Sequence, residues 1–332
     1  NRLARNCYEN RSTAFEACPP RNTSRKSQSG VNKTLELSTT VLRMQLNKND
    51  REAFVEFGLE AGTYDKNYSN SPDRYPDHVF RLRIFLDLLK KIQPKSLLDA
   101  GCGSGVPLAT FLKAGFNAYG FDRSPEMVQE TSKRLSANGL DPSRAFEGDL
   151  DTFSRPISEL FDAIVGLGTV YYTVDTRRTV GHLASNLSPN GDIIFSLRNE
   201  LFSLGSLNEY SADFLLQQIY NTSQLTESAK SSLQQIVSER FPKANIEKLF
   251  ANVDERQIRS NLHNPLTVES ELLEPNGLKL KNIYYYHFHA LPPIFEHTHQ
   301  QEFYQLSSER EIPSDWRGMF SASCFVVHAT KI

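Results

Sequence analysis

Several common signatures are weak or missing in this chain of 332 residues. It has four cysteines, and their spacing matches no metal-ligand pattern. No uninterrupted apolar run approaches the ~20 residues of a membrane-spanning helix. The formal net charge is −2, so the overall basic excess that marks many nucleic-acid-binding proteins is absent. Composition therefore predicts an ordinary globular protein and gives no reason to expect a membrane span, a metal or a nucleic-acid partner.

The most informative segment is a glycine-rich turn, LLDAGCGSG, at residues 97–105. A short apolar strand, Ser96–Leu98, leads into the acid Asp99. Three glycines follow at alternate positions, namely Gly101, Gly103 and Gly105. Glycines between a strand and a helix let the chain bend tightly and let a ligand approach bare main chain. The helix N-terminus adds unpaired N–H groups and the positive end of the dipole. The turn therefore predicts a Rossmann-like nucleotide-binding fold.

The kind of nucleotide follows from the details of this turn. Its spacing is G-x-G-x-G, whereas the dinucleotide fingerprint is G-x-G-x-x-G. The carboxylate of Asp99 disfavours a pyrophosphate and suits a cofactor with a cationic amino-acid end, such as S-adenosylmethionine. Here the chain resembles the class I S-adenosylmethionine-dependent methyltransferases. The resemblance implies that the turn from Asp99 to Gly105, including Cys102, holds the methionine part of the cofactor.

A second acid follows at the expected distance. Asn117–Phe121 predicts a strand that ends in Asp122, and a carboxylate about 20 residues beyond the glycine turn suits a ribose diol. The run from Asp122 through Arg123 to Met127 resembles the D-x-S-x-x-M segment of the family. It also predicts a helix start, with Ser124 as the N-cap and a proline as the first helical residue.

The resemblance continues in order over residues 96–200. Asp149 and Leu150 match the acid and the backbone N–H that hold adenine in the family. Phe161–Gly166 predicts a buried strand, and in relatives the end of this strand, here with Leu167, lies beside the reacting sulfonium. A turn at Leu187–Asp192 and a strand after it close the cofactor half.

Together these motifs imply an α/β fold. We expect a Rossmann-like, seven-stranded, mostly parallel sheet with an antiparallel last strand, plus a helical N-terminal lid and a helical cap insertion. The predicted parts are a flexible N-terminal arm (1–34), the helical lid (35–95), the S-adenosylmethionine-binding core (96–200), the helical cap insertion (201–265) and the completion of the core sheet (266–332). Tyr64 and Tyr68 are candidate cofactor-contacting aromatics of the lid. An organelle-targeting role for the arm stays open.

Candidates for the acceptor side follow the carboxyl ends of the predicted strands, because those ends face the ligand crevice. Three residues are catalytic candidates: Tyr171, His287 and His289. The two histidines are two apart on one predicted strand, so both should face the same side. Four residues are substrate-binding candidates: Arg198, Asn199, Glu200 and, from the cap, His263. Further histidines at 297 and 299 suggest a metal, but no acid or cysteine is placed by spacing to join them, so we expect none.

The expected function is S-adenosylmethionine-dependent methyl transfer to a polar small molecule or a glycan sugar, at oxygen. Methylation of a protein or nucleic acid is the alternative, which the absence of an N-P-P-Y-type segment after the fourth strand disfavours. The intact motif argues against a non-catalytic binding partner with this fold, and the glycine spacing argues against a nicotinamide dehydrogenase. A reducing, cytoplasmic setting is the default for such an enzyme, and the sequence does not predict the oligomeric state.

Overall fold

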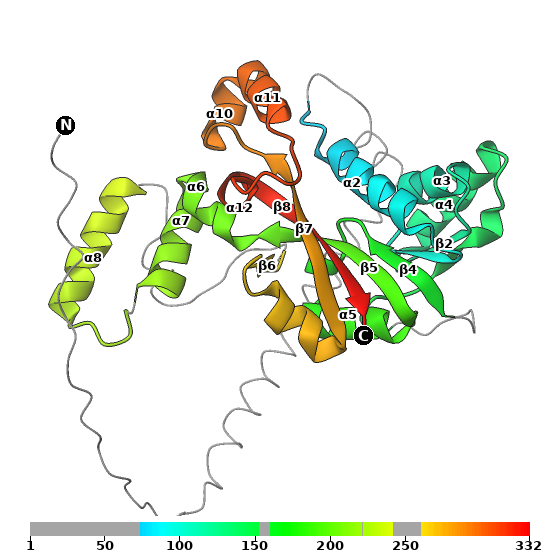
Figure 1. The fold of residues 1–332 in the computed structure, drawn as a ribbon. Helices are drawn as coiled ribbons and strands as arrows, with labels where there is room; N and C mark the ends of the chain where they lie inside the picture. Colours follow the sequence, from blue (N-terminus) through cyan, green and yellow to red (C-terminus); the bar gives the residue numbers. More distant parts are fainter. Residues whose placement is uncertain (1–73, 153–159, 221, 242–259) are drawn as a thin grey trace, which may run out of the picture. The chain divides into compact units, whose positions relative to one another are not determined.

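Figure 1 shows the fold in a computed structural model of the chain. The structure describes residues 74–152, 160–220, 222–241 and 260–332. All of them belong to one of the two units into which the chain divides, Leu46–Ile332. The predicted arm, most of the predicted lid, and with it Tyr64 and Tyr68, lie outside the described residues.

A mixed sheet organises the described chain. Its strands are β1 (Leu97–Ala100), β2 (Ala118–Asp122), β3 (Ala145–Glu147), β4 (Phe161–Gly166), β5 (Leu187–Asn199), β6 (Leu262–His263), β7 (Leu278–Phe288) and β8 (Ala322–Lys331). Their order is β3-β2-β1-β4-β5-β8-β7, and β6 pairs with β5 outside this path. Strands β1 to β5 are mutually parallel, while β8 runs antiparallel between β5 and β7. The predicted fold class is therefore confirmed, with the two-residue β6 as an addition.

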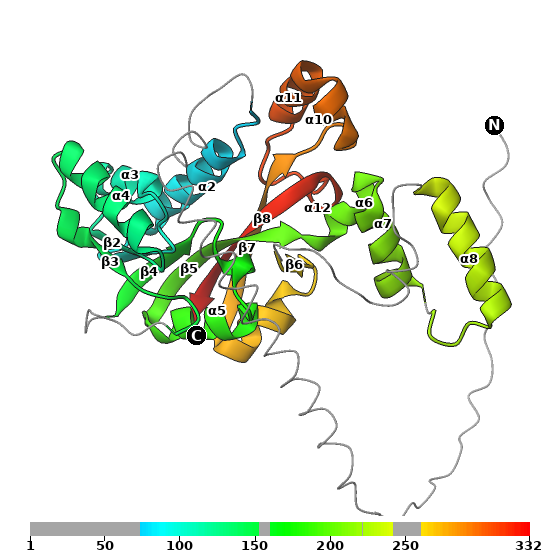
Figure 2. The same cartoon turned by 180° about the vertical axis from the view of Figure 1, so that it is seen from behind.

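Helices cover both faces of this sheet, as Figures 1 and 2 show from opposite sides. The first face carries α2 (Asp77–Ile92) and α3 (Val106–Lys113), whose apolar side chains pack with Leu97 in one core cluster. The other face carries α5 (Thr176–Ser185), which packs with Leu98 in a second cluster. Adjacent residues of β1 thus serve opposite cores, as the period of a strand requires. The strand is apolar throughout except for Asp99, because a parallel sheet is buried on both faces.

The predicted helix start after β2 is confirmed. The Ser124 hydroxyl caps α4 (Pro125–Ala137) by accepting a hydrogen bond from the Met127 N–H at 3.2 Å. Pro125 occupies the first helical position, where its missing N–H leaves no donor unpaired. This cap fixes the direction of the chain just beyond Asp122, one of the predicted cofactor ligands.

The described part of the predicted cap is mostly helical, with β6 near its end. Its helices are η4 (Glu200–Phe202), α6 (Ser203–Ser206), α7 (Glu209–Phe214), the π-helix η5 (Leu215–Ile219) and α8 (Glu227–Arg240). The other helices within the described residues are η2 (Pro142–Arg144), η3 (Val170–Tyr172), η6 (Glu269–Leu273), η7 (Glu274–Asn276), α10 (Ile294–Thr298), α11 (Gln300–Glu309) and α12 (Gly318–Ser321). Among the helices described, none is both long and apolar enough to cross a membrane.

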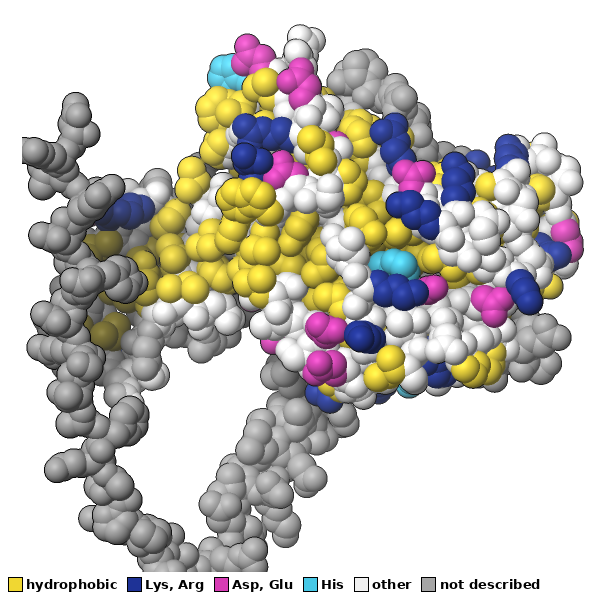
Figure 3. Space-filling view, viewed as in Figure 1, with side chains coloured by type: hydrophobic (Ala, Val, Ile, Leu, Met, Phe, Trp, Pro, Cys, Tyr) yellow, Lys and Arg dark blue, Asp and Glu magenta, His cyan; other side chains and the backbone are white. Residues whose placement is uncertain are grey.

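The surface differs between the predicted cap and the helices of the first face. Leu204 on α6 and Phe320 on α12 are both exposed, and these two helices contact each other. Figure 3 shows hydrophobic side chains gathering over this part of the molecule, while charged side chains are more frequent over α2 and its neighbours. Apolar side chains are therefore exposed where α6, in the predicted cap, meets α12.

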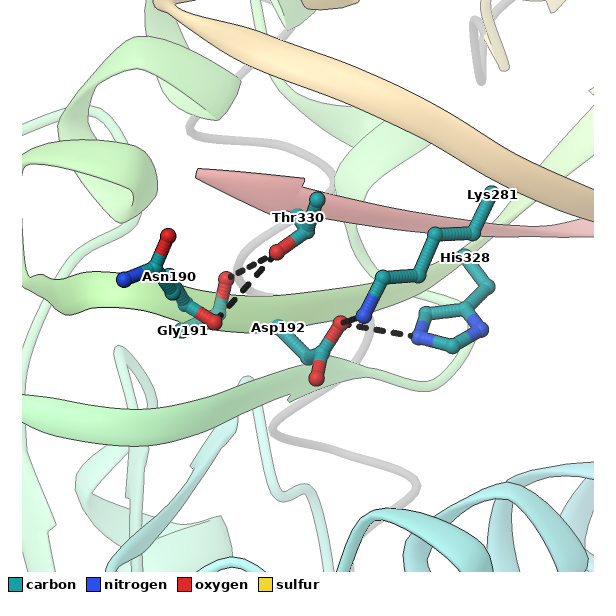
Figure 4. A network of polar contacts seen from close by, with 6 residues as sticks. All are labelled: Asn190, Gly191, Asp192, Lys281, His328 and Thr330. Carbon is teal, nitrogen blue, oxygen red and sulfur yellow. Dashed lines mark hydrogen bonds and ion pairs between the residues drawn. The ribbon is translucent and has the colours of Figure 1, made fainter. Parts of the chain in front are cut away.

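One predicted turn is part of a strand instead. Leu187–Asp192 begins β5, and the pairing of β4 with β5 shifts register between Phe161 and Ala163. Figure 4 shows what holds this irregular start. Asp192 accepts hydrogen bonds from Lys281 Nζ at 2.5 Å and from His328 Nε2 at 3.0 Å, which joins β5 to β7 and β8. Burial alone would raise the pKa of Asp192, but these two partners hold it below its usual value.

Candidate cofactor and acceptor site

Asp99 is the centre of the candidate cofactor site. It is fully buried near the end of β1, and neither carboxylate oxygen has a hydrogen-bond partner among the described residues. Burial raises its pKa to about 8; the nearby charge of Asp122 adds to this rise and Arg81 opposes it. A buried polar group without a partner is costly and needs an explanation. A cationic ligand group that pairs with the carboxylate supplies one.

The glycines of the turn are required by both conformation and space. Gly101, Gly103 and Gly105 have φ values of 77°, 55° and 80°, in the left-handed region that favours glycine. A Cβ added to Gly101 would lie 2.5 Å from Thr169 Cγ2, and one added to Gly105 would lie 2.6 Å from Thr131 Cγ2. Gly101 and Gly105 are therefore required by the close packing of Thr169 and Thr131 as well as by the conformation of the turn.

Asp122 ties the end of β2 to this turn. Its Oδ2 accepts the Gly103 N–H at 2.9 Å, and its Oδ1 accepts the Ser124 N–H at 3.0 Å. Burial raises its pKa, against the lowering effect of these bonds and of Arg123. Each carboxylate oxygen retains a lone pair, so the side chain can accept two further hydrogen bonds, as a ribose diol requires. The neighbouring Cys102 is a buried thiol whose raised pKa keeps it neutral.

The other predicted cofactor residues lie along the same edge of the sheet. The Gly148 N–H donates to Asp122 O at 3.0 Å, which places Asp149 and Leu150 next in the chain beyond β3. Asp149 Oδ1 accepts the Asp151 N–H, and Leu150 packs half-buried against the core. Met127 is buried in the protein. Gly166 ends β4 and Leu167 follows it, and the segment after β4 is tied to β1 by the Thr169 hydroxyl, which donates to Ala100 O at 3.0 Å.

A cavity of about 330 Å³ is linked to this edge by two of its lining residues: Gly168, two residues after the end of β4, and Arg81, whose charge acts on Asp99. Its lining includes Arg81, Gly168, Tyr171, Arg198, Tyr286 and His287. These residues come from α2, from the segment after β4, and from β5 and β7. The structure thus brings together three candidates predicted for the acceptor side, Tyr171, Arg198 and His287.

The two predicted histidines differ in position. His287 lines the cavity, with φ of 59°, and its Nδ1 has no partner among the described groups. His289 is packed between Phe202 and Phe303 at ring distances of 4.6 and 5.3 Å and does not line this cavity. Burial, together with nearby charge, lowers the pKa of His287 to about 3 and that of His289 to about 2. Both imidazoles are neutral at pH 7 and are weak bases.

The remaining substrate candidates, Asn199, Glu200 and His263, do not line the cavity. The Asn199 amide donates to the carbonyls of Met319 and Ala322 and accepts the Leu201 N–H, so its polar atoms are used within the protein. Burial raises the pKa of Glu200, and the charges of Glu271 and Asp213 add to the rise. His263 lies on β6, where burial lowers its pKa to about 4. Neither Glu200 nor His263 lines the cavity described above.

Sequence reasoning missed Tyr75, which lines the cavity, and its hydrogen-bond partner Glu311. The Tyr75 hydroxyl donates to Glu311 Oε1 at 2.5 Å, and the same oxygen accepts the Phe288 N–H at 2.8 Å. The Tyr75 ring stacks on His287 at 5.1 Å between centroids. Burial raises the pKa of Glu311 to about 7. These contacts hold the end of β7 in place, and no motif marks residues 75 and 311 as neighbours. Arg81 was missed because it sits within the apolar stripe of α2.

Comparison with known proteins agrees with this geometry. A family model described as a methyltransferase domain matches residues 74–253. A glycine/sarcosine N-methyltransferase from Halorhodospira halochloris is 31% identical over 119 residues, covering 35% of this chain and 44% of the relative. A malonyl-[acyl-carrier protein] O-methyltransferase from Halalkalibacterium halodurans is 30% identical over 155 residues, covering 42% and 55%. The chain spans about half the length of the curated relatives it matches.

Solved structures include magnesium protoporphyrin IX methyltransferase from Synechocystis PCC 6803 with bound SAH, at 14% identity and a TM-score of 0.49 over 85% of this chain and 98% of that one. The family model covers more than half of the chain and takes in the glycine turn, Asp122 and the ends of β3 to β5. The resemblance inferred from the motifs is thereby confirmed: the chain belongs to the S-adenosylmethionine-dependent methyltransferase family.

Proposed function

We propose that this chain transfers a methyl group from S-adenosylmethionine to an oxygen atom of a small polar acceptor. The observation that carries the proposal is Asp99, a buried carboxylate with no partner among the described residues, beside three left-handed glycines. When bound, the donor supplies a methyl carbon activated by a sulfonium. Asp99 would hold its ammonium group, Asp122 its ribose diol, and Asp149 with the Leu150 N–H its adenine.

The cavity supports a small acceptor rather than a macromolecule. About 330 Å³ lies at the small end of the usual range for ligand pockets. Three arginines line it against the two carboxylates Asp77 and Glu296, a balance that disfavours a protonated amine. The neutral His287 imidazole can accept a hydrogen bond from a hydroxyl. These features favour oxygen over nitrogen as the methylated atom.

The test is transfer of label from methyl-labelled S-adenosylmethionine to a cell extract divided by ultrafiltration. We expect label in the small-molecule fraction, and an NMR signal of the product at the shift of a methoxy group. Label confined to macromolecules would contradict the acceptor class. A protein that binds S-adenosylhomocysteine yet labels neither fraction would be a non-catalytic binding partner. Asp99→Asn serves as the inactive control, because the amide cannot pair with an ammonium as a carboxylate does.

The proposal includes a reducing, cytoplasmic setting. Cys102 and Cys324, the two cysteines within the described residues, are both buried free thiols. Free thiols persist where glutathione keeps cysteines reduced. Cell fractionation tests this setting. Methyltransferase activity recovered only outside the reducing compartments would contradict it.

A further inference from the structure

Arg198 is a cation whose partners among the described residues are all neutral. Its Nη1 donates to Cys324 Sγ at 3.6 Å, and its Cζ lies 5.2 Å from the centroid of the Tyr171 ring. Its buried Nε has no hydrogen-bond partner in the described part of the chain. A guanidinium carries five N–H donors. In Arg198 the thiol of Cys324 and the ring of Tyr171 do not use all of them, so donors remain for a ligand. This side chain lines the cavity beside the cofactor edge.

The charges around the cavity add to a positive field. Arg74 and Arg81 line it with Arg198, against Asp77 and Glu296. Asp77 lies 3.7 Å from the His78 ring, and Glu296 accepts a hydrogen bond from the Tyr304 hydroxyl at 3.2 Å. Both acids thus have contacts that do not involve Arg198. Burial lowers the pKa of His78 to about 3, and His287 is neutral as well, so neither histidine alters the balance at pH 7.

The surroundings strengthen the attraction for an anion. Aromatic rings line the cavity, among them Tyr171, Tyr172 and Tyr286. Arg198 is half-buried among these side chains, and charges interact more strongly away from bulk water. The planar fork of an arginine matches the paired oxygens of a carboxylate or a phosphate. Gly168 lines the same cavity two residues after Gly166, which ends β4 at the cofactor edge.

We propose that Arg198 binds an oxyanion group of the methyl acceptor, a carboxylate or a phosphate, so that the acceptor is a small organic anion. This rests on the proposed function and names the substrate class of that site. Arg198 is a substrate-binding residue here: it would anchor the acceptor in the cavity, next to the edge that Asp99 and the glycines form.

The experiment divides the small-molecule fraction of an extract by anion-exchange chromatography. Each part is incubated with the full-length protein and methyl-labelled S-adenosylmethionine. We expect label in the retained anions. Treatment of the retained anions with alkaline phosphatase then distinguishes a phosphate from a carboxylate. Loss of acceptor activity identifies a phosphate, and unchanged acceptor activity identifies a carboxylate.

Variants link the anion to Arg198. Arg198→Met should lower kcat/KM for the labelled acceptor by at least about tenfold, because the anion loses a desolvated partner. Arg198→Lys should fall between this variant and wild type, since it keeps the charge and loses the fork. Arg144→Met is the matched control. Its Cζ also lies over a tyrosine ring, 4.4 Å from the Tyr119 centroid, but outside the cavity, so transfer should be unchanged.

The outcomes separate this inference from the proposed function. Affinity for S-adenosylhomocysteine, measured by calorimetry, should be the same in all three variants and wild type, which also shows that they fold. If label is found only in neutral or cationic molecules, which the column does not retain, the proposal that the acceptor is an anion is overturned. A kcat/KM in Arg198→Met equal to that of wild type would also overturn the proposal. If S-adenosylhomocysteine binds and no fraction takes label, the proposed function itself fails, and the acceptor class fails with it.

Discussion

The cofactor edge and the acceptor cavity are built in different ways. At the cofactor site, Asp99 and Asp122 lie on neighbouring strands within one short stretch of chain, and the Gly103 N–H, in the turn after Asp99, donates to Asp122. The cavity takes its lining from residues as far apart in the chain as Arg74 and Cys324. The first region is set by local backbone geometry, while the second depends on the packing of the whole sheet. Variants at the cofactor site should therefore weaken cofactor binding, whereas variants elsewhere should leave it unchanged.

The largest effect is expected for Gly101→Val. A side chain at φ 77° is strained, and its Cβ would lie 2.5 Å from Thr169. The turn must therefore move, and we expect the variant to lose binding of S-adenosylhomocysteine. Gly139→Val is the matched control, because Gly139 has φ of 69° with nothing within 4 Å of an added Cβ. Calorimetric titration measures both. Equal affinities in the two variants would show that the crowding at Gly101 is irrelevant to the site.

Asp122→Ala should have the next largest effect. Loss of its hydrogen bonds to a ribose diol should weaken S-adenosylhomocysteine binding by about 1–3 kcal/mol. Asp141→Ala is the control: the Asp141 carboxylate also accepts a backbone N–H, from Ser143 at 2.9 Å, but it lies before β3 on the surface. A dissociation constant unchanged in Asp122→Ala would remove Asp122 from the site.

The pH dependence of binding should report Asp99. Its pKa in the free protein is about 8, above the usual 3.8, so the carboxyl is protonated at neutral pH. An ammonium needs the carboxylate, so affinity for S-adenosylhomocysteine should rise by up to about tenfold per pH unit and level off near pH 8. Binding should also release a proton, seen by calorimetry in buffers of different ionisation enthalpy. A flat profile in wild type, or the same slope in Asp99→Asn, would contradict this role.

The same shift predicts how the stability of the free protein varies with pH. The folded state binds the Asp99 proton more tightly than the unfolded state does. Its contribution to stability is therefore present below the unfolded pKa and is lost as pH rises toward 8. Chemical denaturation should show wild type losing this contribution between about pH 4 and pH 8 relative to Asp99→Asn.

Asp192→Asn should have the smallest effect on binding and sharpen the contrast between regions. The variant weakens the contacts to Lys281 and His328 at the start of β5 (Figure 4), and should lower the free energy of unfolding by about 1–2 kcal/mol at pH 7. Because the pKa of Asp192 is lowered in the fold, this difference should shrink as pH falls through that pKa. Altered affinity for S-adenosylhomocysteine would show that the two regions are coupled.

Much of the cofactor edge could be predicted from the sequence, because its rules are local. An acid, glycines at fixed spacing and a capping serine each leave a readable pattern, and the Ser124 cap forms as expected. The prediction of a turn at Leu187–Asp192 was wrong, because the segment belongs to β5: Leu187 pairs with Phe161, and the Thr330 hydroxyl of β8 donates to Asn190 O. A Pro-Asn-Gly sequence suggests a turn, and no local spacing records these contacts.

The cavity could be predicted only in part. Strand ends indicated Tyr171, Arg198 and His287, but strand alternation placed His289 with them. The rings of His287 and His289 do lie 4.8 Å apart, but His289 packs against Phe202 and Phe303, and only His287 lines the cavity. Tyr75 and Glu311 are 236 residues apart, and their contact depends on tertiary packing that no sequence spacing records.

The most direct test of the central claim is calorimetric titration of the full chain at pH 8 with S-adenosylhomocysteine and, separately, with NAD. The account predicts saturable binding of S-adenosylhomocysteine by wild type, loss of that binding in Asp99→Asn, and no heat of binding with NAD. Binding of NAD, or no binding of S-adenosylhomocysteine by a folded wild-type protein, would contradict it.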